Sequence, residues 1–147
     1  MNQQKLLFIL IFCQSCISSM TDEQIYSVDP RLEHYLCQFI DDGQKYGYDF
    51  SKSNIVLLIS NSHPYSHGRA HLRSDNIAHV TIDSGLYYRE MRLDSVHLKY
   101  IIYHELGHAF LRKKHDDKCS SLMYAFQGCS LDRFRIEQQE MIEELFY

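Results

Sequence analysis

The feature that most constrains the fold is the uninterrupted apolar run Ile-Val-Leu-Leu-Ile at residues 55–59. Its β-branched residues and polar boundaries favour a strand over a helix of the same length. Because every position is apolar, we expect a strand that is buried in the centre of a sheet. Residues 77–82, Ile-Ala-His-Val-Thr-Ile, favour a second strand at or next to the sheet edge.

Helical patterns alternate with these strands. Asp29 and Pro30 suit the start of a helix in which apolar residues recur at helical spacing until Gly43 or Gly47. A second helix is expected after Asp94. In chain order the prediction is a helix at 31–47, a strand at 55–59, a loop at 60–76 with a short strand around 70–72, a strand at 77–82, a helix at 95–113, a loop, and a helix at 131–146, which is an α+β arrangement.

The first residues differ from the rest. Lys5 is followed by seven apolar residues at 6–12 and then by small and polar residues, which is the build of a signal peptide. The run is far shorter than the ~20 apolar residues of a membrane-spanning helix. We therefore expect residues 1–19 to comprise a leader and the start of a spacer, and the protein to be exported.

The mode of export depends on Cys16. The pair Ser15-Cys16 resembles a bacterial lipoprotein box, which implies cleavage before Cys16 and lipid attachment to it. The product would be a lipoprotein of the bacterial cell envelope that meets the membrane only through this anchor. Plain cleavage near residue 18 or 19, which would give a secreted protein, is the alternative.

Composition limits the classes of function. The 147 residues, 45% of them apolar and 23% charged, suit one globular domain, which we expect at residues 20–147. The 15 Lys and Arg residues against 19 Asp and Glu residues give a net charge of −4, which offers no basic surface for nucleic acid. We expect a monomer without a nucleic-acid partner.

Three of the five cysteines lie in the predicted domain: Cys37, Cys119 and Cys129. Export permits a disulfide. Cys119 and Cys129 flank one loop and are the natural pair, whereas Cys37 lies in a helical pattern and is expected to be a buried thiol. Sequence alone does not establish the connectivity.

A His-Glu-Leu-Gly-His motif, residues 104–108, lies inside the helix predicted at 95–113. Residues four apart on a helix are ~40° apart in angle and one turn apart in height, so His104 and His108 can face one ion. Neutral imidazole is a standard zinc donor, and catalytic zinc keeps one position open beside three protein ligands. Glu105, offset by ~100°, would lie beside the open position.

The chemistry explains the residue types. Zinc lowers the pKa of bound water to ~7, and an adjacent carboxylate can take the proton as the water attacks a carbonyl. Glu105 is therefore the candidate general base. A helix with two surface histidines, which is the alternative reading of the motif, would leave Glu105 unexplained.

Residues after the motif extend the pattern. His115 lies seven residues beyond His108, and the segment Cys-Ser-Ser-Leu-Met-Tyr follows at 119–124. On these residues the chain resembles the metzincin peptidases, whose motif continues with a third His and a Met-containing turn. The resemblance implies that His115 is the third ligand of one catalytic Zn²⁺ and that Met123 forms an apolar floor beneath it. Asp116 is the rival third ligand.

The spacing departs from the usual metzincin pattern, which has a Gly three residues and a His six residues past the second His. Here those positions hold Leu111 and Lys114, so a different turn must return His115 to the metal. The longer form resembles small bacterial zinc-dependent metalloproteinase lipoproteins, which share the HELGH, His-Asp and Ser-Leu-Met features. This resemblance covers residues 77–147 well and residues 20–76 only in general layout.

The resemblance implies a metzincin-like fold: a small twisted mixed sheet with an N-terminal helix, an active-site helix and a C-terminal helix. It implies hydrolysis of peptide bonds inside a peptide or protein substrate. One alternative is a gluzincin-like peptidase whose third ligand is Glu137 or Glu140 on the last helix. The other is a non-catalytic, zinc-stabilised binding module of the cell envelope.

Other side chains have weaker claims. His63, His67 and His71 are spaced by four, but Pro64 and Gly68 break any helix that would align them. The resemblance still makes His67, His71 and His79 candidates for a structural zinc, because related peptidases sometimes carry one before the edge strand. His97 is expected to pack near the site. An extended substrate could pair with the strand at residues 77–82, and Tyr124 could contact it.

Overall fold

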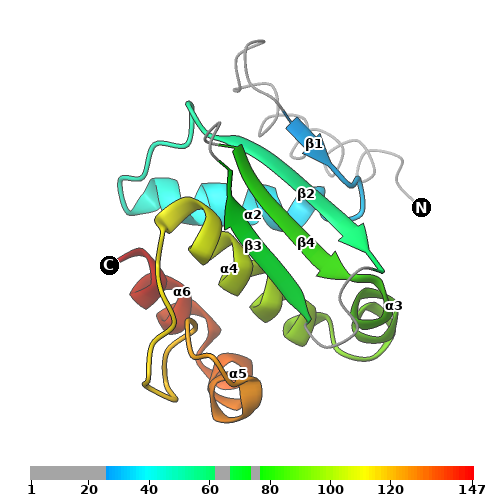
Figure 1. Cartoon of the computed structure of the whole chain (residues 1–147). Helices are drawn as coiled ribbons and strands as arrows, with labels where there is room; N and C mark the ends of the chain where they lie inside the picture. The colour runs from blue at the N-terminus through cyan, green and yellow to red at the C-terminus, as the bar shows by residue number, and fades with distance from the viewer. Residues whose placement is uncertain (1–25, 62–66, 74–76) are drawn as a thin grey trace, which may run out of the picture.

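The structure, a computed structural model, describes residues 26–61, 67–73 and 77–147. The expected leader with Cys16, and also His63, lie outside the described residues. The described chain has an α+β fold in which five helices accompany a four-stranded mixed sheet (Figure 1). The elements are β1 (Tyr26–Val28), α2 (Glu33–Lys45), β2 (Asn54–Ser60), β3 (Gly68–Leu72), β4 (Ile77–Asp83), α3 (Ser84–Leu93), α4 (Ser95–Leu111), α5 (Gln127–Ile136) and α6 (Gln138–Phe146).

The strand order in the sheet is β1-β2-β4-β3. β1, β2 and β4 run parallel, and β3 runs antiparallel to β4, pairing Gly68 with Ile82 and Leu72 with Ala78. β4 is thus next to the edge, as its sequence predicts, and β3 forms the edge. The idea that a substrate strand pairs with residues 77–82 is wrong, because β2 and β3 already occupy both sides of β4.

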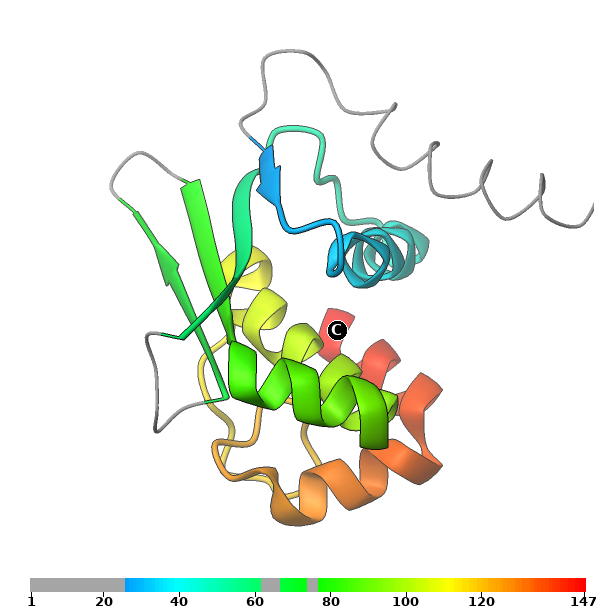
Figure 2. The same cartoon turned by 90° about the vertical axis from the view of Figure 1, so that its right-hand side faces the viewer.

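The sheet is covered on one face by helices (Figure 2). Ile55, Leu57 and Val80 are fully buried on that face. Leu58, which points the other way, is 37% exposed. The prediction of a central strand at residues 55–59 is confirmed, but the strand is buried on one face only, because the described helices lie on the same side of the sheet.

Helix α4 packs against β3 and β4 and also contacts α2, α3 and α5, and the apolar residues along its length explain this position. Leu98, Ile102 and Leu106 are fully buried. At its start, the Asp94 carboxylate accepts hydrogen bonds from the N–H groups of Val96 (3.1 Å) and His97 (3.0 Å). Such a cap satisfies donors that the first helical turn leaves unpaired, so the predicted start of the helix is confirmed.

Three elements differ from the predictions. β1 and α3 were not anticipated; the Asp83 carboxylate accepts a hydrogen bond from the Leu86 N–H (2.8 Å) at the start of α3. The single helix predicted at 131–146 is two helices, α5 and α6, which meet at Glu137 (φ −119°, ψ 40°). None of the described helices is long and apolar enough to cross a membrane.

Candidate metal centre

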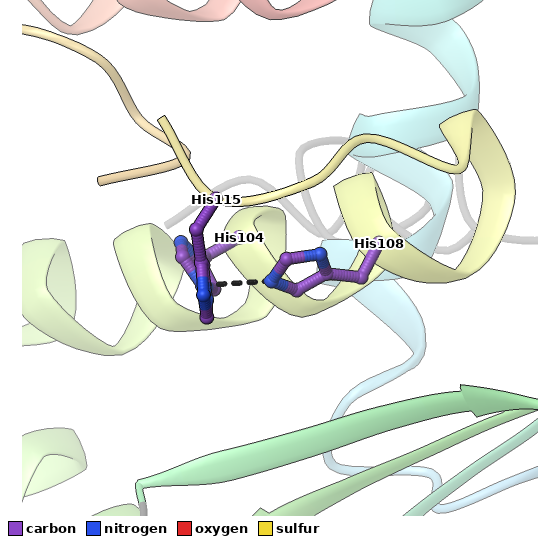
Figure 3. A group of neighbouring side chains, drawn as sticks. All are labelled: His104, His108 and His115. Carbon is purple, nitrogen blue, oxygen red and sulfur yellow. Dashed lines mark hydrogen bonds between the residues drawn. The ribbon is translucent and has the colours of Figure 1, made fainter. Parts of the chain in front are cut away.

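Three imidazoles converge beside α4 (Figure 3). His104 and His108 project from the helix, and His115 comes from the segment that follows it. The Nε2 atom of His104 lies 3.1 Å from that of His108 and 3.3 Å from that of His115. Donors around a tetrahedral zinc, with Zn–N distances of about 2.0–2.1 Å, lie about 3.3–3.4 Å apart. This group could hold a metal ion.

The second nitrogen of each helical ring is held by the main chain. His104 Nδ1 lies 2.8 Å from the Leu122 carbonyl oxygen, and His108 Nδ1 lies 2.7 Å from that of Lys113. A carbonyl only accepts, so Nδ1 carries the proton on both rings and Nε2 carries the lone pair. Metal-ligating histidines are oriented in this way.

The protonation of these rings supports a cation site. Burial lowers the pKa of His104 to about 4, and burial also lowers the pKa of His108. Both rings are therefore neutral near pH 7, and no proton lies between their two Nε2 atoms. Two lone pairs that face each other at 3.1 Å repel unless a cation lies between them. The donor set thus fits a metal ion.

A turn at residues 121–124, here called the methionine turn, supports two of the three rings. Leu122 provides the carbonyl that holds His104. The Met123 carbonyl accepts a hydrogen bond from the Asp116 N–H (2.9 Å), which fixes the backbone directly after His115. The same short segment therefore orients one ring and positions the chain that carries another.

The methionine turn is itself tied to α4 and α5. Ser130, fully buried on α5, donates a hydrogen bond from Oγ to the Ser121 carbonyl (2.6 Å) and accepts one from the Tyr100 hydroxyl (2.9 Å). Tyr100 lies on α4, one turn before His104. A disulfide between Cys119 and Cys129 encloses the turn, whereas Cys37 is buried and takes no part in a disulfide.

Met123 packs against α4 at Gly107. It is 3% exposed. A Cβ atom on Gly107 would lie 2.8 Å from Met123 Sδ and 3.2 Å from Leu145 Cδ1. Gly107 therefore lets the methionine turn approach the helix backbone.

The chain leaves α4 through a left-handed residue. Arg112 has φ 54° and ψ 25°, and the Lys113 N–H donates to the Gly107 carbonyl (3.2 Å). This turn aims the Lys113 carbonyl at His108 and sends the chain back over the helix to His115. It is the different turn that the one-residue-longer spacing requires.

Glu105 lies on the side of α4 that faces the edge strand. It is 8% exposed and, together with the three histidines, lines a cavity of about 380 Å³. Gly68 and Ala70 of β3 line the same cavity, as does Tyr124. Burial raises the pKa of Glu105 to about 7, opposed by a hydrogen bond from the Ala70 backbone. The carboxylate therefore lies beside the imidazole group without belonging to it.

The rival third ligands lie elsewhere. One Asp116 carboxylate oxygen accepts a hydrogen bond from the Lys118 N–H (2.9 Å). Glu137 and Glu140 lie 2.5 Å and 3.9 Å from the Arg133 guanidinium. Among the described residues, the three imidazoles are the one group of His, Cys, Asp or Glu side chains placed to share a metal ion.

The other histidines that the structure describes do not form a second group of this kind. The rings of His71 and His79 stack across β3 and β4 with centroids 5.2 Å apart. His67 instead packs near His97, at 5.9 Å. Within the described ranges, the structural zinc site considered for His67, His71 and His79 is not assembled.

Several contributors to the site were missed from the sequence. The carbonyls of Lys113 and Leu122 carry no side-chain signal. Ser130 looks like any polar residue of an amphipathic helix. Gly68 was read as a helix breaker, although its place in a strand next to small Ala70 was a signal of close backbone approach.

Comparisons of this chain with models of protein families, with curated proteins and with solved structures find no match.

Proposed function

We propose that the protein is a zinc-dependent metalloendopeptidase of the metzincin kind, in which His104, His108 and His115 hold the metal and Glu105 is the general base. The observation that carries the proposal is the convergence of three Nε2 atoms next to a buried carboxylate. Three histidines alone could serve a structural metal, and a buried carboxylate alone could serve packing. When both line one cavity, they provide the metal donors and the general base of a hydrolytic site.

The three-donor arrangement favours a catalytic role over a structural one. Structural zinc sites are usually closed by four protein ligands, whereas catalytic sites keep one position for water or substrate. No fourth His, Cys, Asp or Glu of the described chain joins the three rings. The three imidazoles line a cavity large enough for part of a peptide.

Each residue has a definite task in this proposal. A bound zinc ion would polarise a substrate carbonyl and activate a water molecule. Glu105 accepts the proton of the attacking water at its carboxylate and delivers it to the leaving amine. Its pKa, raised to about 7 by burial, suits both halves of that transfer near neutral pH. The carbonyls of Leu122 and Lys113 keep the rings oriented throughout.

The metzincin assignment is favoured over the gluzincin alternative by the position of the third ring. His115 comes from the segment after the helix, and the methionine turn lies beneath α4. The disulfide is typical of an oxidising compartment. We therefore also propose an exported peptidase that acts as a monomer on peptides or proteins.

The test combines metal binding with cleavage. Purified protein should bind one zinc ion per chain, measured by elemental analysis and calorimetry, and should cleave members of a diverse peptide library. Glu105→Gln should retain the zinc but lose activity by roughly 10²–10⁴-fold, since it removes the base and not a ligand. One zinc per chain without Glu105-dependent cleavage would instead support the non-catalytic binding module.

A second set of variants tests which residue is the third metal ligand. His115→Ala should weaken zinc binding by more than about 100-fold, because changes to groups that merely orient a ligand already cost 10–100-fold. Asp116→Asn and Glu137→Gln are the matched controls and should keep the metal. Loss of zinc in Glu137→Gln with retention in His115→Ala would establish the gluzincin arrangement.

A further inference from the structure

We propose that the edge strand β3 positions the Glu105 carboxylate, with Gly68 providing the space and the Ala70 N–H providing the hydrogen bond. This inference rests on the proposed function, since it concerns the residue assigned there as the base. Gly68 and Ala70 are positioning residues in this scheme: they act through Glu105 and do not touch the reacting atoms.

The space at Gly68 is filled by one side chain. A Cβ atom on Gly68 would lie 2.8 Å from Glu105 Cγ, 3.0 Å from Oε1 and 3.1 Å from Cδ. These are the three nearest atoms, so the close approach is between β3 and the Glu105 side chain and not between β3 and the helix backbone. Contacts this short are repulsive, so any side chain at residue 68 displaces the carboxylate.

The backbone conformation at residue 68 does not explain why this residue is a glycine. Gly47 is the glycine with positive φ in the described ranges, and Gly68 lies in an ordinary strand. Gly inside a strand is unfavourable because it has no side chain to pack and loses more conformational freedom. Its presence in β3 is therefore accounted for by what it faces.

The neighbouring residues complete the arrangement. Gly68 pairs with Ile82, and Ala70 pairs with Val80. Ile82 and Val80 are fully buried on the face that α4 covers, so both small residues of β3 point toward the helix. The Ala70 backbone donates a hydrogen bond to the Glu105 carboxylate. The Glu105 side chain is thus held in one position, and a base that is already in place lowers the entropy cost of reaching a reactive geometry.

Gly68→Ala tests the inference, with Gly128→Ala as the matched control. A Cβ on Gly128 would meet nothing within 4 Å, so the same chemical change there has no neighbour to move. In Gly68→Ala we expect zinc affinity within about twofold of the parent, a kcat reduced by roughly 10²-fold and an unchanged KM. Gly128→Ala should match the parent in all three quantities.

A readout independent of activity follows the hydrogen bond itself. In ¹H–¹⁵N spectra of the zinc-loaded protein, the Ala70 amide should shift in Gly68→Ala and in Glu105→Gln, but not in Gly128→Ala. In the Glu105→Gln background, Gly68→Ala should reduce cleavage no further, because the group that it displaces is already inactive. If Gly68→Ala instead caused a general structural defect, the double variant would cleave more slowly than Glu105→Gln alone.

Three outcomes would overturn the inference: an unmoved Ala70 amide, an unchanged kcat, or a zinc affinity that falls as far as kcat. If Gly68→Ala does not fold, Ala70→Pro removes the donor N–H at an edge position that tolerates proline and should give the same loss of kcat with zinc retained. If the parent protein shows no Glu105-dependent cleavage, the proposed function fails, while the Ala70 amide still decides whether β3 holds the carboxylate.

Discussion

The Nδ1 protons of His104 and His108 go to carbonyls on the loop that follows α4 and not to groups on the helix itself. Each ring is therefore fixed at two points that are separated along the chain. A ring fixed in this way loses little rotational freedom when a metal binds. The entropy cost of binding is therefore small, and the affinity for the metal is higher.

Arg112 provides a prediction at the same scale. It is exposed and adopts the left-handed conformation (φ 54°), which costs a residue with a Cβ roughly 1–2 kcal/mol relative to glycine. Arg112→Gly relieves this strain but also loosens the unfolded chain, so we expect the free energy of unfolding to rise by about 0.5–1 kcal/mol. Urea denaturation monitored by circular dichroism would measure this change in the free energy of unfolding.

The matched variant is Arg112→Val, since a β-branched residue is least suited to positive φ. It should lower the free energy of unfolding and weaken zinc binding, because the turn carries the Lys113 carbonyl to His108. Equal stability of the Gly and Val variants would contradict the role assigned to this turn.

The sequence predicted side chains at this scale better than it predicted backbone groups. Helical spacing alone implied that His104 and His108 share one face, and the structure places them so. The position of His115 required a resemblance, because periodicity does not describe the path of a loop. The carbonyls of residues 113 and 122 were invisible, since any residue type can supply one.

At the scale of elements, the methionine turn is the piece on which the site depends most. It contacts α4 through Met123 and is tied to α5 through Ser130. The Cys119–Cys129 disulfide closes a ten-residue separation around it. The turn is thus restrained from three directions.

Reduction of this disulfide should weaken the metal centre. A closed loop of this length stabilises a fold by about 3 kcal/mol through the unfolded chain. We expect a Cys119→Ser/Cys129→Ser variant to lose about that much free energy of unfolding and to bind zinc about tenfold more weakly, because Leu122 and Met123 are less restrained.

Calorimetric titration with zinc measures the effect, with Cys37→Ala as the control that removes a cysteine thiol and keeps the disulfide. Unchanged zinc affinity in the double variant would show that the hydrogen bonds of Ser130 and Asp116 are sufficient to hold the turn.

The sequence predicted long elements with a regular apolar pattern more reliably than short ones. The α4 helix and the β2 and β4 strands were found because long apolar patterns specify them. β1 has three residues and is held by pairing with β2, so its sequence carries little signal. The break at Glu137 was missed because amphipathic spacing continues through it, while Arg133 binds both Glu137 and Glu144 across the bend.

At the scale of the whole molecule, the candidate site joins segments that the unfolded chain keeps apart: α4, the strand edge β3 and the methionine turn. The unfolded chain does not offer the three imidazoles in one place. Zinc should therefore bind the folded state preferentially, and stability should depend on zinc concentration.

We expect the midpoint of thermal unfolding to rise with free zinc, and the stabilisation to reach about 4 kcal/mol when zinc exceeds its dissociation constant 1,000-fold. Differential scanning calorimetry across a zinc series measures this. Glu105→Gln should keep the full shift and His104→Ala should lose it. A zinc-dependent shift of equal size in His104→Ala would place the binding site elsewhere.

The position of β3 at the end of the sheet also affects how copies of this chain meet. Within the described ranges β3 is the last strand, and the edge of a sheet can recruit another extended backbone, including that of a second copy. β3 is only five residues long and carries exposed Arg69 at its second position. We expect a short edge with a positive charge to disfavour pairing between copies, which would leave the cavity that β3 lines accessible to substrate in concentrated protein.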